Sequence, residues 1–250
     1  NKQINSFHSL DGKINIFFYI YLHYKHLIKS YFLKKNYFQF VKNIKFTNSK
    51  YVFFAMHNQP EKTTNPEGEG FEDNFSAINF LRMVLPKEIL ILVKEHPKQL
   101  NMYSGDVRQL KFRNFKYYKK IKNLNNVKLV PIDTKTDVLI ENSILNSTIT
   151  GTVAWESVLK KKPAISFGNT WHSNCNSTPV ISRDHLQAKK QIEILLNKTE
   201  KDIENDVSDF FKINSKFFFN STISNFELQN TSKNYEILFK NMKNLIEQVL

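Results

Sequence analysis

One short segment constrains the fold of this chain more than any other. Residues 144–159 have the sequence ILNSTITGTVAWESVL and are followed directly by KKKPAISFG, which ends at Gly168. This pattern predicts an apolar strand, a turn at Gly151, a helix over 152–159 and a second strand over 164–167. A strand, a glycine turn, a helix and a further strand make up the repeating unit of a parallel α/β sheet.

The same segment has the chemistry of an anion site. A glycine lets the backbone come close to a ligand, and the start of a helix offers unpaired N–H groups to a phosphate. Thr152 and Glu156 are four residues apart, so both face one side of the helix, where a hydroxyl suits a phosphate and a carboxylate suits a sugar hydroxyl. An ordinary crossover, with Glu156 complementing the helix dipole, explains the segment equally well.

Strand and helix patterns alternate from residue 51 to residue 168, which predicts a Rossmann-like, doubly wound parallel sheet. Thr134 and Asp137 form a weak capping box before one of the helices. We expect three parts: a basic helical segment over 1–50, a nucleotide-sugar-binding domain over 51–180, and C-terminal helices over 181–250 that pack on it. The expected strands cover 51–56, 88–93 and 127–131, and the expected helices cover 73–85, 114–122 and 136–142.

Polar residues follow several of these strands. Ligands of parallel α/β sheets bind at the carboxyl ends of the strands, so residues far apart in sequence are expected to meet at one rim. Pro97 holds the residue before it, His96, in an extended conformation at a strand end. The residues predicted for the rim are His57, Lys94, Glu95, His96, Pro97, Asp133, Thr150, Gly151, Thr152 and Gly168.

The net charge is +13, and residues 1–50 carry nine lysines against one acidic residue, Asp11. This excess suits an anionic partner such as a membrane surface or a nucleic acid. The apolar run from Ile14 to Leu22 is too short to span a bilayer, which takes about 20 apolar residues. We therefore expect a cytoplasmic protein, peripheral at the inner membrane face, whose first segment is an amphipathic helix with lysines along it.

Two observations bound the chemistry. Cys175 is the only cysteine, so an internal disulfide is impossible, and no activating motif surrounds it. The acidic cluster Glu67, Glu69, Glu72 and Asp73 lacks the spacing of metal ligands, and we expect neither a metal nor another cofactor. The sequence also contains no glycine-rich dinucleotide fingerprint, P-loop or zinc-ligand spacing.

Four motifs, in this order, resemble the nucleotide-binding half of bacterial capsular polysaccharide biosynthesis proteins, which are similar to the Kdo and sialic acid transferases that share a His-Pro motif. The resemblance covers about residues 51–170. The motifs are HNQPE over 57–61 with Thr63 and Thr64, Leu85-Pro86, VKEHP over 93–97, and TGTVAWE over 150–156 followed by Lys162-Pro163.

The resemblance implies a metal-independent GT-B glycosyltransferase that uses a nucleotide sugar, commonly a CMP-linked acidic sugar, with a glycan or glycolipid acceptor. His96 and Pro97 then match the motif that contacts the donor phosphate, residues 150–152 match the phosphate-binding turn, and Glu156 matches the acid that holds the ribose. Gln59, Lys94 and Glu95 complete the expected donor-binding set. His57 or Glu61 is the candidate general base.

The chain departs from this family in one respect, because a GT-B enzyme has two Rossmann-like halves and 250 residues accommodate one. We expect the acceptor-binding half to lie upstream of this chain. Two other functions remain open from the sequence: a nucleotide-sugar epimerase on the same fold, and a non-enzymatic basic module that binds nucleic acid or anionic membrane through residues 1–50. We expect a nucleotide sugar, and no nucleic acid, as the partner.

Overall fold

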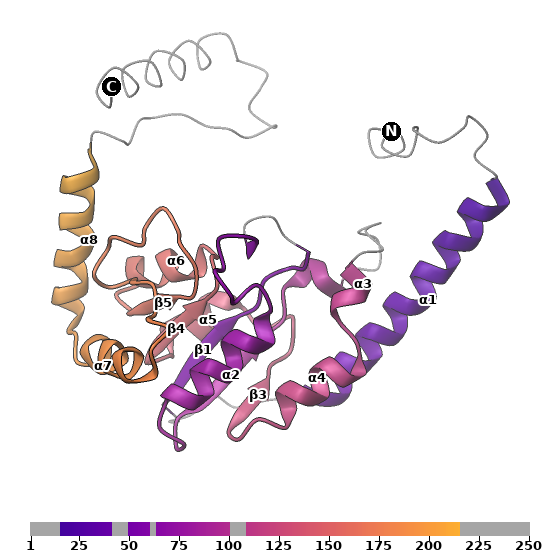
Figure 1. The fold of residues 1–250 in the computed structure, drawn as a ribbon, viewed down its shortest axis with the longest axis horizontal. Coiled ribbons are helices and arrows are strands. Elements are labelled where there is room, and N and C mark those ends of the chain that lie inside the picture. The colour runs from indigo at the N-terminus through magenta and orange to yellow at the C-terminus, as the bar shows by residue number, and fades with distance from the viewer. Residues whose placement is uncertain (1–15, 42–49, 61–63, 101–108, 216–250) are drawn as a thin grey trace, which may run out of the picture.

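The computed structural model describes residues 16–41, 50–60, 64–100 and 109–215 and contains a five-stranded sheet (Figure 1). The strand order is β3-β2-β1-β4-β5, and each neighbouring pair is parallel. This order is that of a Rossmann-like, doubly wound sheet, so the predicted fold class is confirmed. The strands are β1 (Tyr51–Ala55), β2 (Leu90–Lys94), β3 (Val127–Leu129), β4 (Leu145–Thr148) and β5 (Ala164–Ser166).

Helices cover both faces of the sheet because the strand side chains alternate between two apolar clusters. One face packs against helices α1 (Ile16–Phe40), α2 (Asn74–Val84), α4 (Phe115–Lys122) and α7 (His185–Leu196). The other face packs against α5 (Thr136–Glu141) and the start of α6 (Val153–Leu159), and α8 (Glu200–Asn214) lies against α6. Two short elements, η3 (Pro97–Leu100) and α3 (Gln109–Phe112), complete the described fold.

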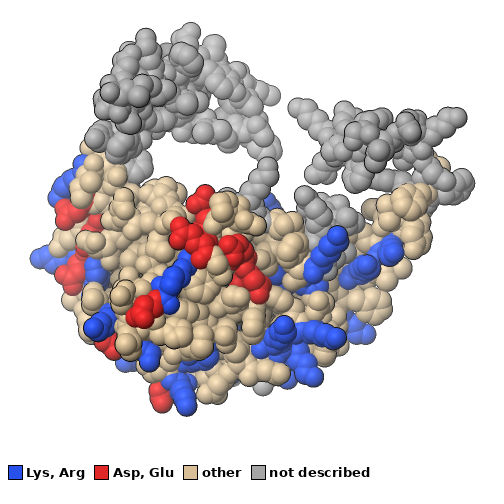
Figure 2. Space-filling model, in the orientation of Figure 1, with Lys and Arg blue, Asp and Glu red and all other residues tan. Residues whose placement is uncertain are grey.

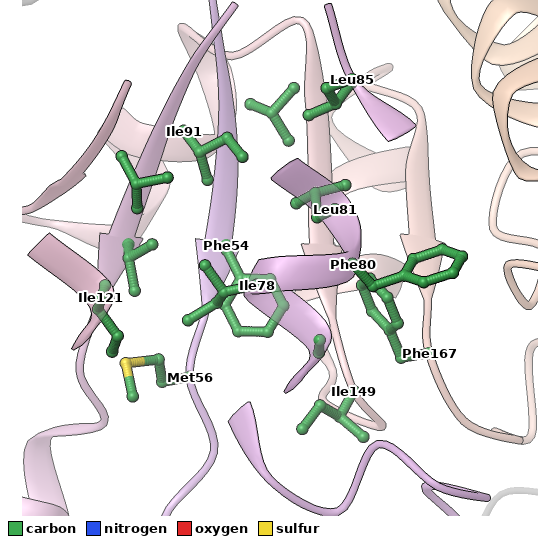
Figure 3. Packing of buried hydrophobic residues seen from close by; sticks show 14 of the residues in the cluster. Phe54, Met56, Ile78, Phe80, Leu81, Leu85, Ile91, Ile121, Ile149 and Phe167 are labelled. Atoms are coloured by element: carbon green, nitrogen blue, oxygen red, sulfur yellow. The ribbon is translucent and has the colours of Figure 1, made fainter. Parts of the chain in front are cut away.

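The larger cluster fixes the loop after β1 as well as the sheet. In Figure 3, Phe54 of β1 and Ile91 of β2 meet Ile78 and Leu81 of α2. Phe167, just after β5, lies 6.0 Å from Phe54 between ring centroids and 4.9 Å from Phe71 of the loop. Aromatic pairs at these separations add stability beyond the area that they bury. The loop is thereby packed onto the carboxyl end of the sheet.

The second half of α1 is part of the sheet domain, although the sequence places a boundary at residue 50. Leu33 and Tyr37 lie in the larger core cluster, and Tyr37 is fully buried. The Tyr37 hydroxyl donates to the Val130 carbonyl at 2.5 Å, and its ring lies 5.1 Å from that of Tyr118 in α4. Burial raises the pKa of this hydroxyl far above its usual value, so it remains a donor.

The described strands and helices lie within a few residues of their predicted bounds. The capping box predicted at Thr134 and Asp137 is wrong, because α5 begins after Lys135 and no side chain caps it. Helices α7 and α8 confirm the helical pattern expected after the sheet. The apolar stripe from Tyr235 to Val249 lies outside the described residues, as do residues 1–15.

We predict that Tyr37→Ala lowers the free energy of unfolding by about 3–5 kcal/mol, because it removes a fully buried aromatic side chain and its hydrogen bond. Phe38→Ala is the matched control: its side chain is 46% exposed, and we expect a loss below about 1 kcal/mol. Urea unfolding of both variants measures the difference. Equal small losses would show that α1 folds apart from the sheet.

Candidate functional site

The loops after β1 and β4 meet at the centre of the sheet edge. These strands are neighbours, and the chain leaves them toward opposite sides of the sheet, which makes this the switch point where doubly wound folds bind ligands. The Thr150 N–H donates to His57 Nε2 at 3.0 Å, and Thr148 Oγ1 lies 3.0 Å from the same nitrogen. This ring nitrogen of His57 therefore holds the turn after β4 in place.

The close approach of these two loops requires glycine at position 151. A Cβ added to Gly151 would lie 2.7 Å from Thr148 Oγ1 and 3.2 Å from His57 Nε2. The first separation is shorter than van der Waals contact permits, so a side chain here forces the turn away from His57.

Thr152 and Glu156 lie side by side at the start of α6, as their spacing predicts. The Thr152 hydroxyl donates to Glu156 Oε1 at 2.6 Å. Thr152 is exposed and Glu156 is half-buried, so the pair presents a hydroxyl and a carboxylate at the surface next to Gly151.

The residues that end β2 point in alternate directions. Lys94 donates from Nζ to Thr136 Oγ1 at 2.8 Å, at the start of α5. Burial lowers the pKa of Lys94, and the nearby carboxylate of Asp133 opposes that shift. The structure therefore brings Lys94 together with Asp133 and Thr136, on the β3 side of the switch point.

Glu95 lies inside the protein and not at the exposed rim expected of a donor-binding residue. Its Oε2 accepts from Arg113 Nε at 2.6 Å and from the Tyr118 hydroxyl at 3.0 Å, and its Oε1 accepts from the His96 N–H at 2.9 Å. Neither the Glu95 nor the Arg113 side chain has any exposed surface. The carboxylate is thus fully engaged by the protein.

Arg113, which sequence reasoning missed, connects the loops after β1 and β2. Besides Glu95, its guanidinium donates to Gln59 Oε1 at 2.6 Å and to the His57 carbonyl at 3.1 Å. Burial on its own lowers the pKa of Arg113, but the adjacent Glu95 carboxylate raises that pKa above its ordinary value. Arg113 therefore remains charged and holds Gln59 and His57 in place.

The imidazole of His96 is oriented by the backbone. The Lys98 N–H donates to His96 Nδ1 at 3.2 Å, so a neutral ring carries its proton on Nε2 and is a donor there. Pro97, which is exposed, begins η3 directly after it. His96 itself is half-buried at the β2 end, one strand away from the switch point.

Asn58 provides an unsatisfied polar atom at the switch point. Its Oδ1 is buried, and no hydrogen-bond partner for it exists among the described residues. Buried oxygens of this kind are uncommon in folded proteins and cost about 1–3 kcal/mol each when left unpaired. An acceptor in this position is suited to a ligand donor. The next predicted site residue in this loop, Glu61, lies outside the described residues.

An aromatic cluster flanks Glu156, and sequence reasoning missed it too. Trp155 of α6 stacks on His172 with 5.8 Å between ring centroids and lies 4.8 Å from Trp171, which is 56% exposed. Burial lowers the pKa of His172 to about 4, so this ring is neutral at pH 7. Neutral aromatic rings of this kind can stack on a sugar or nucleobase ring.

Within the described part of the chain, no three His, Cys, Asp or Glu side chains gather as metal ligands. The acids of the loop after β1 are used in other ways. Glu72 accepts from the Gly70 N–H at 3.0 Å, and Asp73 accepts from the Tyr117 hydroxyl at 3.1 Å.

No protein-family model matches this sequence, and no curated protein does either. Several solved structures are similar in fold. A KpsC β-Kdo 2,7 transferase from Thermosulfurimonas dismutans is 13% identical, with a TM-score of 0.40 over 66% of this chain and 51% of that chain. A UDP-GlcNAc 2-epimerase from Methanocaldococcus jannaschii is 19% identical, with a TM-score of 0.43 over 72% and 49%.

The wall teichoic acid polymerase TagF is 14% identical, with a TM-score of 0.40 over 90% of this chain and 50% of that chain. This chain thus spans about half the length of the three structures. At such identities and scores the likeness says nothing of donor, acceptor or reaction.

We predict that Arg113→Met and Glu95→Leu each destabilise the protein by about 3–5 kcal/mol, because each leaves an unpaired charge in the interior. The double variant should lose much less than the sum of the two, since it removes both charges. Chemical denaturation of the parent, the two single variants and the double variant gives the four free energies of unfolding of this double-mutant cycle. Additive losses would contradict direct coupling between the two side chains.

Proposed function

We propose that this chain is the donor-binding part of a glycosyltransferase that transfers a sugar from a nucleotide-linked donor, a CMP-linked acidic sugar, to a glycan or glycolipid. We place the reaction in surface polysaccharide assembly, at the cytoplasmic face of the inner membrane. The resemblance of the four sequence motifs supports the donor class and the setting. The proposal does not involve a metal or another cofactor.

The observation that carries the proposal is the unsatisfied Asn58 Oδ1 at the switch point. It lies in the loop after β1, next to His57, and His57 is bonded to the turn after β4. A buried acceptor that the described protein groups leave without a partner is satisfied when a ligand hydroxyl or amine donates to it. A nucleotide sugar offers such donors on its ribose, its sugar and its base.

In this proposal different residues at the sheet edge bind different parts of the donor. His96 donates from Nε2 to the donor phosphate, and the backbone of residues 150–152 lies along it. Glu156 accepts from the ribose hydroxyls, with Thr152 holding its carboxylate. The rate enhancement comes from positioning and from stabilising the charge on the departing phosphate.

The two candidates for the general base differ in support. His57 Nε2 accepts from the Thr150 N–H, which supports a positioning role for this ring. Glu61 stays the predicted base.

Gln59 and Glu95 act through Arg113 by fixing the loops after β1 and β2. Lys94 contributes positive charge at the β2 end.

We predict that His96→Ala and Glu156→Ala each weaken nucleotide affinity about 10- to 150-fold, since a hydrogen bond to a charged group contributes roughly 1.5–3 kcal/mol. Free nucleoside should respond to Glu156→Ala but hardly to His96→Ala, because it lacks the phosphate. Calorimetric titration with CMP, UDP, GDP and the nucleosides provides the measurement. Glu193→Ala, at an exposed position of α7, is the control.

If His96→Ala and Glu156→Ala bind every nucleotide as the parent does, the donor-site assignment fails. Binding of a nucleotide sugar followed by its conversion without any acceptor would identify an epimerase instead. Transfer of the sugar from the nucleotide to a glycan or glycolipid acceptor would identify the transferase.

A second prediction concerns Asn58. Because its Oδ1 has no partner in the described structure, Asn58→Ala should leave the free energy of unfolding unchanged or raise it by about 1 kcal/mol, while nucleotide-sugar affinity falls at least 10-fold. Asn74→Ala is the matched contrast: its amide bonds the His57 N–H at 2.8 Å and the His57 carbonyl at 3.2 Å, so we expect a loss of stability. Thermal melts with and without ligand separate the two effects. A destabilised Asn58→Ala would show that this side chain is structural.

A further inference from the structure

Helix α1 is buried on one side and exposes apolar side chains on the opposite side. His26, Ser30, Leu33 and Tyr37 recur at spacings of three and four and form its buried stripe against the domain. The side chains that point the opposite way on a helix of 3.6 residues per turn include Tyr24, Ile28 and Phe32, which are 62%, 56% and 53% exposed. A helix on the surface of a globular protein normally has polar residues on its outer face.

Lysines flank this outer apolar stripe. Lys25 and Lys29 lie along one side of it, Lys34 lies along the other, and Lys35, two turns after Ile28, ends the stripe; all four are exposed. Tyrosines occupy the same exposed region, with Tyr21 at 56% and Tyr31 at 55% exposed. An apolar stripe bordered by aromatic rings and lysines is the arrangement of helices that lie in a membrane interface, where the long lysine side chains reach the headgroups.

Helix α4 extends the positive charge of this surface. It packs beside α1, with Phe40 and Phe115 5.1 Å apart between ring centroids. The two helices together carry no carboxylate, and Figure 2 shows their blue side chains along one side of the molecule. Their exposed lysines are Lys25, Lys29, Lys34, Lys35, Lys116, Lys119, Lys120 and Lys122.

We infer that the outer face of α1, together with the lysines of α4, is a docking surface for an anionic lipid bilayer. The lysines match the charge of acidic headgroups, and Tyr24, Ile28 and Phe32 enter the boundary between headgroups and acyl chains. None of the described helices is both long and apolar enough to cross the membrane, so the contact is with the surface. This inference does not depend on the proposed enzymatic function.

Charge and hydropathy favour lipid over the other occupants of such a face. A second copy of the same surface would bring lysines against lysines without a carboxylate between them. A nucleic acid would match the lysines, but its backbone offers no apolar region to receive Ile28. An anionic bilayer satisfies both the lysines and the apolar stripe.

The test is co-sedimentation with large unilamellar vesicles of phosphatidylcholine alone or with 30 mol% phosphatidylglycerol, at about 0.05 and 0.5 M NaCl. We expect the parent protein to bind the anionic vesicles at least 10-fold more tightly than the neutral ones, with most of the difference lost at high salt. Equal binding to both vesicle types, or to neither, would overturn the inference.

Two variants identify the surface. Lys25→Gln/Lys29→Gln/Lys34→Gln should weaken binding to the anionic vesicles about 10- to 100-fold, since each lysine near the surface contributes roughly a few-fold in affinity. The matched control, Lys189→Gln/Lys190→Gln/Lys201→Gln, changes the net charge equally on α7 and α8 and should lose less than about threefold. If both triple variants lose the same affinity, net charge alone explains binding and the assigned surface is wrong.

A second pair of variants tests the apolar stripe of α1. Ile28→Ser/Phe32→Ser should reduce binding at both salt concentrations, whereas Leu186→Ser/Ile194→Ser, exposed to similar extents on α7, should not. Light scattering without vesicles measures whether the protein forms a dimer. A dimer that Ile28→Ser/Phe32→Ser abolishes would assign the face to a second copy, and tighter binding to an oligonucleotide than to vesicles would assign it to nucleic acid. Either result overturns the inference.

Nucleotide affinity is the separate readout for the proposed function. We expect all of these surface variants to bind nucleotide as the parent does. Failure of vesicle binding with intact nucleotide binding would reject the docking surface alone, and the reverse would reject the donor site alone.

Discussion

The buried pair of Arg113 and Glu95 is the interaction on which the candidate site depends. Two charges without exposed surface are costly to bury, and they persist here because every oxygen of the carboxylate and all three guanidinium nitrogens have hydrogen bonds. Besides Glu95, the guanidinium of Arg113 is bonded to Gln59 and to the carbonyls of His57 and Phe112. The pair thus fixes the loop after β1 relative to the end of β2, and through His57 it also fixes the turn after β4.

This arrangement explains why consecutive residues at the end of β2 have different roles. Side chains alternate in direction along an extended chain. Glu95 therefore points toward Arg113, while its neighbours Lys94 and His96 point away from that residue. Glu95 accepts from the His96 N–H, which ties the backbone of His96 to the ion pair. Within the sequence Lys94-Glu95-His96-Pro97, Glu95 therefore supports the backbone of His96 and the neighbouring loops.

The sheet was predictable from sequence because alternating strand and helix patterns with short connections permit few other architectures. The turn at Gly151 was predictable for a similar reason, although only the structure shows that a side chain at this position would collide with Thr148 and crowd His57. Arg113 was not, since it follows no motif and its partners are 18 and 54 residues away in sequence. The capping box failed because the start of α5 is fixed by packing of Leu139 and Ile140 and not by its cap.

The aromatic cluster was missed for another reason. Trp155 belongs to the same TGTVAWE motif as Glu156, but Trp171 and His172 follow β5, and only the parallel pairing of β4 with β5 brings the two segments together.

The two sides of helix α1 are under different constraints: one side is buried in the core and the other is exposed. Its buried stripe is set by the core, where Tyr37 fills space between β3 and α4, so substitutions there are limited by folding. Its outer stripe makes no contribution to that core, and exposing Tyr24, Ile28 and Phe32 to water is unfavourable for an isolated domain. Apolar residues at these positions, flanked by lysines, are consistent with a contact made outside the folded domain. Helix α1 therefore packs on the sheet domain with one side and faces the membrane surface that we infer with the other.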